Sequence, residues 1–220
     1  MFHHSFEQNQ SRWPVMLIGF RLGVVMALVS TVLPLSTFAQ ENPRNSFPGR
    51  RVGGGTRAAC SSRVLAHLVP TSSVFAPAPA GTLGLLHGPT PVPVALNISF
   101  RPQSGGQAMT RTLPAASAGI TLIKLDAVET PQIWESHFAC QTSGPSDQQS
   151  FGFVGTDVPP ALSLLVTSPE AADQVVWQTL TMLQQRCGSS IPTSLILKEF
   201  GLTDVITSDW PKQLPVRCPA

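Results

Sequence analysis

The segment from residue 92 to residue 100 alternates strictly between large apolar side chains and small or polar ones. Successive side chains of a β-strand point to opposite faces, so this alternation predicts a strand with one buried face. Pro93 has no amide hydrogen to donate to a neighbouring strand, which places it near the strand start or on a sheet edge. The apolar positions are Val92, Val94, Leu96, Ile98 and Phe100.

Other short segments between residues 60 and 158 also carry strand signals, and glycine-containing turns separate them. Several short strands at this spacing predict an antiparallel β-sandwich of immunoglobulin-like type. The proline-rich stretch 69–93 is expected to be a loop between two strands. The further strand segments are 64–69, 107–113, 120–125, 133–141 and 150–154.

Residues 159–220 change to helical signals and are expected to pack on the sandwich. Ser168 can cap a helix that ends before Gly188, and a second helix is predicted over residues 193–200, with Gly201 as its stop. The predicted fold class is therefore α+β, mainly β with two or three short C-terminal helices. The buried stripe expected on the first helix is Ala172, Val176, Leu180 and Leu183.

The first 39 residues have the pattern of a secretory signal peptide. Arg21 precedes an apolar core of 14 residues, 22–35, and small residues allow cleavage after Ala39. This pattern predicts an exported protein, periplasmic or extracellular, with no membrane span after cleavage. Met16 is an alternative to Met1 as the true start, because it leaves a more compact signal.

Charge is distributed unequally along the rest of the chain. Residues 42–125 contain eight bases and no acid, whereas residues 126–220 contain ten acids and four bases. One interpretation is a basic surface for an anionic polysaccharide or lipid. The alternative is that the two halves pack together and neutralise each other. The bases of the first half are Arg44, Arg50, Arg51, Arg57, Arg63, Arg101, Arg111 and Lys124.

The chain has four cysteines, and an even number favours two disulfides in an exported protein. Three pairings are available. We expect Cys60–Cys140 and Cys187–Cys218, because each pair then stays within one structural zone. No C-x-x-C motif or common zinc spacing is present. Cys140 falls on the same predicted strand face as Trp134 and Phe138, opposite Glu135 and His137.

The segment from Pro48 to Cys60 reads Pro-Gly-Arg-Arg-Val-Gly-Gly-Gly-Thr-Arg-Ala-Ala-Cys. Together with Leu65–Pro70, Gly88–Thr90 and the later segments 134–140, 151–155, 177–186 and 197–206, it resembles the bacterial domain of unknown function 928 family. The resemblance covers residues 47–218 and implies an exported protein with a Cys60–Cys140 disulfide and no assigned activity. Ala58 stands where the family usually has glycine, and residues 91–96 lack the aromatic side chains expected there.

The arginine- and glycine-rich lead-in, residues 40–59, is expected to be flexible. Its structural motif is Gly53, Gly54, Gly55, Thr56 and Arg57. Arg57 is expected to pair with an acid of the second half. Arg50 and Arg51 are expected to remain exposed and to bind a partner.

The sequence contains no G-x-S-x-G, H-E-x-x-H or phosphate-loop motif, and its mature histidines, His67, His87 and His137, are widely spaced. We therefore expect a non-enzymatic interaction domain with a protein partner in the cell envelope and no cofactor or metal. The alternative is a binding module for an anionic polysaccharide or lipid, and an enzyme of unrecognised type is the third hypothesis. Nucleic acid is not expected as a partner, because the bases are not interleaved with aromatic residues.

The signal sequence generates a first prediction. The mature protein should begin at Gln40, because cleavage after Ala39 fits the small-residue requirement of signal peptidases. N-terminal sequencing of protein from the exported fraction measures this directly. Intact Met1 or Met16 on membrane-embedded protein would contradict it.

Overall fold

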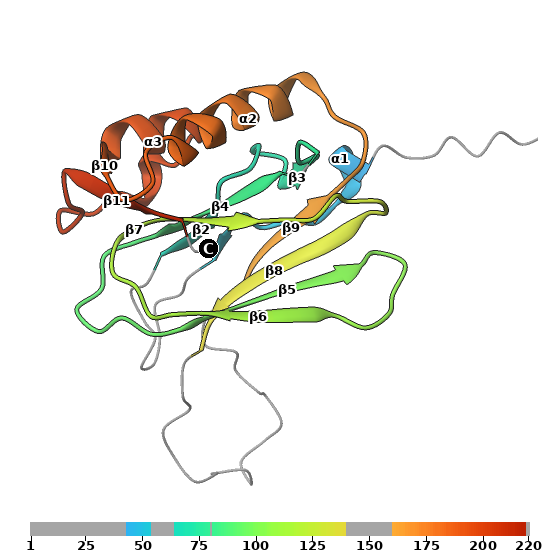
Figure 1. The fold of residues 1–220 in the computed structure, drawn as a ribbon, viewed down its shortest axis with the longest axis horizontal. Helices are drawn as coiled ribbons and strands as arrows, with labels where there is room; N and C mark the ends of the chain where they lie inside the picture. The colour runs from blue at the N-terminus through green and yellow to red at the C-terminus, as the bar shows by residue number, and fades with distance from the viewer. Residues whose placement is uncertain (1–42, 54–63, 80, 140–159, 219–220) are drawn as a thin grey trace, which may run out of the picture. The chain divides into compact units, whose positions relative to one another are not determined.

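The computed structural model describes residues 43–53, 64–79, 81–139 and 160–218. The chain divides into two units, Met1–Ala39 and Gln40–Ala220, and all described residues belong to the second. Within this second unit the described residues form two β-sheets and a few short helices (Figure 1). The predicted α+β class, mainly β, is confirmed at this level.

One sheet has six strands in the order β1-β2-β4-β7-β11-β10. All neighbours in it are antiparallel except β7 and β11, which are parallel. The strands are β1 (Val52–Gly53), β2 (Leu65–His67), β4 (Thr82–His87), β7 (Gly119–Lys124), β11 (Gln213–Arg217) and β10 (Ser190–Pro192).

The other sheet has five strands in the order β3-β9-β8-β5-β6. Here β3 and β9 are parallel and the other neighbours are antiparallel. The two parallel pairs among the described strands differ from the purely antiparallel arrangement predicted from short strands. The strands are β3 (Val74–Phe75), β9 (Ala161–Leu165), β8 (Gln132–Phe138), β5 (Leu96–Pro102) and β6 (Met109–Leu113).

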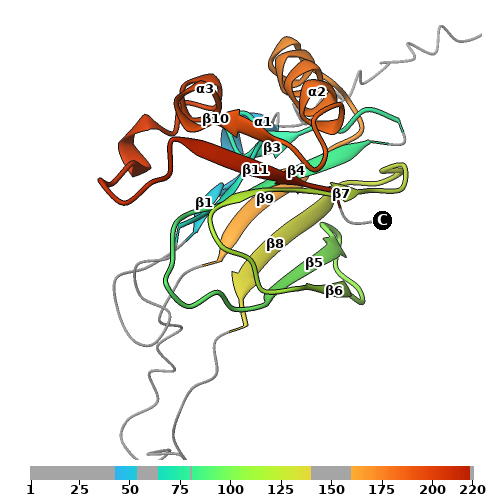
Figure 2. The same ribbon diagram turned by 60° about the vertical axis from the view of Figure 1, so that its left-hand side comes forward.

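The helices are α1 (Pro43–Ser46), α2 (Ala171–Gln184), α3 (Thr193–Glu199) and the 3-10 turn η1 (Thr203–Val205). Helix α2 covers the face of the six-stranded sheet that points away from the five-stranded sheet (Figures 1 and 2). A Cβ built on Gly84 of β4 would lie 2.8 Å from the Leu180 side chain of α2. The helix and the strand therefore pack so closely that a larger residue at this position would displace neighbouring leucine side chains.

The alternating segment forms strand β5, but the strand begins at Leu96 rather than at Val92. Leu96, Ile98 and Phe100 are at most 2% exposed, so the predicted buried face is correct for these three residues, whereas Val92 is 61% exposed. The residues before Leu96 include Pro91 and Pro93, which lack the amide hydrogens that a ladder requires. This accounts for the later start.

Strand β4 lies inside the stretch 69–93 that was predicted to be a loop. All six of its residues are buried, because one face packs against α2 and the other faces the five-stranded sheet. A strand that is buried on both faces has no alternation between apolar and polar residues. The prolines on either side of β4 therefore predict a loop, because the segment has no alternation that would predict a strand.

The region 159–220 is not purely helical, since β9, β10 and β11 also lie in it. Strand β11 pairs with both β7 and β10, so it is an interior strand of the six-stranded sheet. Helix α2 begins after Glu170 rather than at Ser168. Its buried stripe contains Asp173 in addition to the expected Val176, Leu180 and Leu183, whereas Ala172 is exposed.

The expectation of a flexible lead-in is wrong for residues 43–53. The backbone of Arg50 exchanges hydrogen bonds with that of Leu162 in β9, with N–O distances of 2.9 and 2.7 Å. Two residues later, Val52 pairs with Ala66 in β2. The chain passes from one sheet to the other here, and this pairing holds the segment in place.

The two sheets are joined in their interior by His67 of β2, which is fully buried. Its ring lies 3.5 Å from that of Trp134 of β8 and is stacked parallel to it. Its Nδ1 atom lies 2.8 Å from Ser163 Oγ and its Nε2 atom 2.9 Å from Ser136 Oγ. Both imidazole nitrogens are therefore hydrogen-bonded, which offsets the cost of burying a polar ring between two sheets.

Burial of the imidazoles predicts acid sensitivity. Burial lowers the pKa of His67 well below 6.5, and burial together with the charge of Arg217 lowers the pKa of His87 to about 4. Between those folded-state values and pH 6.5 the unfolded chain binds more protons, so stability is fully present above pH 6.5 and falls as the pH drops. The free energy of unfolding should fall by up to about 1.4 kcal/mol per pH unit for each histidine.

Urea unfolding of the oxidised protein between pH 7.5 and pH 5 measures this slope. Replacement of His67 by Gln should remove about half of it, whereas His137→Gln, at an exposed position, should leave it unchanged. Identical slopes in wild type and His67→Gln would show that His67 is not the group that titrates.

Candidate functional site

Arg44 of α1 connects the first half of the chain to the second. Its guanidinium lies 2.6 Å from Asp173 Oδ2 and 3.0 Å from Glu170 Oε1. The Arg44 side chain is 8% exposed and the Asp173 side chain is fully buried. At this point the basic and acidic halves neutralise each other, as one of the two interpretations of the charge pattern proposed.

Asp173 also accepts hydrogen bonds from two backbone amides. The amide of Glu170 lies 2.7 Å from Oδ2, which forms part of a capping box at the start of α2, and the amide of Ala76 lies 3.2 Å from Oδ1. A buried carboxylate with a cation and two amides around it is fully paired. It ties α1, the residue after β3 and α2 together.

Arg51 is not available as a free binding residue. It is half-buried, and its Nη1 atom donates to the carbonyl oxygens of Phe200 at 2.6 Å and Val69 at 3.2 Å. Its Nη2 atom donates to Gly201 O at 3.2 Å. Carbonyls at the C-terminal end of a helix attract cations, so Arg51 caps α3. Arg50 is exposed, as expected.

Most of the remaining predicted motif lies outside the described residues. This applies to Gly54, Gly55, Thr56, Arg57, Cys60 and Cys140. The predicted pairings Arg57 with an acid and Cys60 with Cys140 therefore remain predictions. Gly53 is described, and it is buried in β1.

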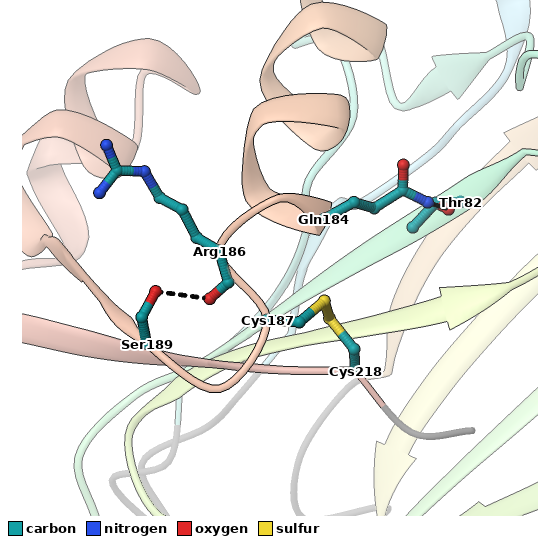
Figure 3. The surroundings of a disulfide bond; sticks show 6 residues. All are labelled: Thr82, Gln184, Arg186, Cys187, Ser189 and Cys218. Carbon is teal, nitrogen blue, oxygen red and sulfur yellow. Dashed lines mark hydrogen bonds between the residues drawn. A yellow bond between two sulfur atoms is a disulfide. The ribbon is translucent and has the colours of Figure 1, made fainter.

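The predicted disulfide between Cys187 and Cys218 is present, with a Cα–Cα distance of 5.6 Å. Figure 3 shows that it connects the turn after α2 to the end of β11. The side chain of Ser189 closes the same turn by donating to the carbonyl oxygen of Arg186 at 2.7 Å.

The three histidines lie in different environments. His67 and His87 are buried in the six-stranded sheet, whereas His137 is exposed on β8, 3.8 Å from Glu135. Within the described ranges, no group of three or more His, Cys, Asp or Glu side chains is arranged to hold a metal ion. Trp210, which the sequence places beside Asp209, packs against the apolar core.

A partly apolar surface surrounds Trp177, and we call it the Trp177 surface. It consists of two adjoining hollows of about 460 and 360 Å³, which share Trp177. The larger is open and follows α2, and it is lined by Gln174, Trp177, Gln178, Thr181, Met182 and Gln185. The smaller is lined by the loop 77–79, the pair 127–128, and Val166, Thr167, Pro169 and Trp177.

The Trp177 ring is held in one orientation. Its Nε1 atom donates to Ala76 O at 2.7 Å, and the amide of the same residue, Ala76, is bound by Asp173. Pro77 and Pro79 follow directly in the chain and restrict the backbone of the adjoining loop. The Trp177 ring and the adjoining loop are therefore restrained before any partner binds, which lowers the entropy cost of binding.

Exposed charges lie in the chain next to this surface. Asp126 and Glu129 enclose Ala127 and Val128 and are exposed, and Lys124 is exposed at the end of β7. The third nearby carboxylate, Glu170, is already paired with Arg44. The free charge beside the smaller hollow is therefore mainly negative.

Sequence reasoning did not identify this surface. Trp177 adjoins Val176 of the predicted buried stripe, and a tryptophan beside such a stripe is usually part of the core. The residues that form the smaller hollow are separated by up to about 100 positions in the chain. No local pattern reports that they meet.

Comparison with known proteins identified no relative of this chain. No family model, no curated protein and no solved structure matches it. The resemblance to the domain of unknown function 928 family therefore remains a prediction. In the described part of the chain no helix has the length and apolar character needed to cross a membrane.

The contacts of Arg51 generate a prediction. Arg51→Ala should lower the free energy of unfolding by about 2 kcal/mol, because it removes charge-assisted hydrogen bonds to three carbonyls. Arg50→Ala is the matched control and should change it by less than about 0.5 kcal/mol, as is usual for exposed side chains. Denaturant unfolding of the two variants measures the difference. Equal effects would mean that the Arg51 contacts contribute no more to the free energy of unfolding than an exposed charged side chain does.

Proposed function

We propose that this chain is an exported, non-enzymatic binding domain that holds an extended segment of a protein partner on the Trp177 surface. The observation that carries the proposal is the rigid apolar hollow beside α2, in which Trp177 is fixed by its hydrogen bond to Ala76. Tryptophan is enriched among the residues that dominate binding energy at protein interfaces. Its position at the junction of the two hollows suits an anchor of this kind.

The chemistry of the surface indicates the class of partner. The lining of the smaller hollow contains no charged residue, so it suits an apolar or proline-containing segment. Asp126 and Glu129 are exposed beside it, and Lys124 offsets only part of their charge. A segment with an apolar centre and basic ends is therefore the complementary ligand.

The alternative function, binding of an anionic polysaccharide or lipid, receives less support. Arg44 and Arg51 are committed to carboxylates and carbonyls within the domain, and Arg111 donates to Lys124 O at 3.4 Å. Arginines that are engaged in this way contribute less to a free basic surface. Arg50 and Arg101 remain exposed.

The proposal also includes export of the protein and its structural and family relationships. The signal-like sequence before Gln40 and the Cys187–Cys218 disulfide support a periplasmic or extracellular location. The packing of two sheets supports a relation to immunoglobulin-like sandwiches, although β3–β9 and β7–β11 are parallel. Membership of the domain of unknown function 928 family remains part of the proposal on its residues alone.

Binding of designed peptides tests the function. A fluorescein-labelled peptide with an apolar, proline-containing centre and lysines at both ends should bind more tightly than the same peptide with glutamates at its ends. Asp126→Asn combined with Glu129→Gln should reduce this preference several-fold and reduce its salt dependence. Fluorescence anisotropy measures both effects.

Two variants on α2 provide the matched control. Gln178→Arg places a long side chain in the larger hollow and should abolish binding, whereas Val175→Arg adds the same charge at a position that is 49% exposed and lines neither hollow. Equal binding of both peptides, or equal effects of the two arginine variants, would reject the proposed surface.

A further inference from the structure

His87 and Arg217 lie on the same face of the six-stranded sheet, near one end of it, and the charge of Arg217 acts on His87. His87 of β4 pairs with Gly119 of β7, and Arg217 of β11 pairs with the next β7 residue but one, Thr121. His67, whose ring contacts the five-stranded sheet, pairs with Leu85. Because side chains alternate along β4, Leu85 and His87 face the same way as His67, toward the five-stranded sheet.

The Arg217 side chain lies across Gly119. A Cβ built on Gly119 would be 3.0 Å from Arg217 Cζ and closer still to Nη1, and the residue has a φ of +154°. Any larger residue would therefore be strained and would displace the guanidinium. Because Gly119 has no side chain, the Arg217 guanidinium has room to lie beside His87, the residue that pairs with Gly119.

Both groups carry a buried nitrogen without a partner among the described residues. These atoms are His87 Nε2 and Arg217 Nη1. The other guanidinium nitrogen, Nη2, donates to Ala118 O at 3.1 Å and lies 3.4 Å from Ser117 Oγ. Trp134 Nε1 and Trp210 Nε1 are also unpaired, so an orphaned atom alone is not a site. His87 and Arg217 differ from the two tryptophans because they are two such residues beside one glycine, Gly119, and one of them is a cation.

We propose that His87 and Arg217 form a binding site for a single carboxylate group. One carboxylate oxygen would accept from Arg217 Nη1 and the other from His87 Nε2. The planar guanidinium matches a carboxylate in geometry and charge, and charge-assisted hydrogen bonds are stronger than neutral ones. Arg217 is half-exposed and Ser117 is exposed, so a small ligand would enter from that side, and His87, at 3% exposure, would lie at the inner end of the site.

The electrostatics of His87 agree with this assignment. Its pKa is lowered to about 4, first by burial and second by the positive charge of Arg217. Both causes arise from residues that the structure describes. The imidazole is therefore neutral at pH 7 and can act as a donor through Nε2. A carboxylate beside Arg217 would offset the positive charge and raise the pKa of His87.

This site differs from the Trp177 surface, since its residues come from β4, β7 and β11 and none of them lines the two hollows. It is therefore independent of the proposed function. Failure of one proposal leaves the other standing.

NMR titration of the His87 imidazole tests the site. Addition of sodium acetate, compared with sodium chloride at equal ionic strength, should raise the pKa of His87 by one unit or more. Arg217→Lys should weaken the acetate response at least tenfold, and Arg217→Gln should abolish it. Arg101→Gln, at an exposed arginine of β5, is the control and should retain it.

The outcomes separate the alternatives. No acetate-dependent shift in the folded protein, which would indicate ordered water only, overturns the proposal, as does a response that survives Arg217→Gln. A response to phosphate without one to acetate overturns the carboxylate assignment. Trialanine with a free carboxyl end is then compared with its amide, which distinguishes the possible sources of the carboxylate. Binding of the acid alone indicates a peptide carboxylate, whereas binding of acetate but of neither peptide indicates a small free acid.

Discussion

The buried carboxylate of Asp173 holds together the parts of the domain that local structure alone would leave separate. It binds Arg44 from α1, the amide of Ala76 after β3 and the amide that begins α2. Ala76 in turn accepts from the Trp177 ring. One ionised group thus fixes the lead-in, the helix start and the anchor of the Trp177 surface. A buried charge is tolerated here because both carboxylate oxygens of Asp173 accept hydrogen bonds.

The interior between the sheets uses polar groups in a different way. His67 is satisfied by Ser136 and Ser163, so it joins the sheets without carrying charge. His87 is also buried and Arg217 is half-exposed, and each retains a buried nitrogen without a partner among the described residues. His67 therefore has a structural role, whereas the unpaired nitrogen of His87 is the basis of the proposed carboxylate site.

The sequence predicted elements well where one face is exposed. The alternation in β5 and the faces of Trp134 and Phe138 in β8 follow from a boundary between core and solvent. The same reasoning failed for β4, where Leu83, Leu85 and Leu86 face two apolar layers. It also failed for Arg51, because two of the three carbonyls that engage it lie about 150 residues away in the chain.

The sequence by itself predicted the mainly β class and the approximate limits of α2 and α3, because periodicity and caps act over short distances. It favoured the Cys187–Cys218 pair among three possible pairings, and the structure contains that disulfide. Tertiary structure alone decided which arginines are engaged, that β11 is an interior strand, that Trp177 borders two hollows, and that His87 and Arg217 share a sheet face. These outcomes depend on which distant segments share a face. Long-range packing sets that arrangement, and the loop entropy that opposes it leaves no local trace in the sequence.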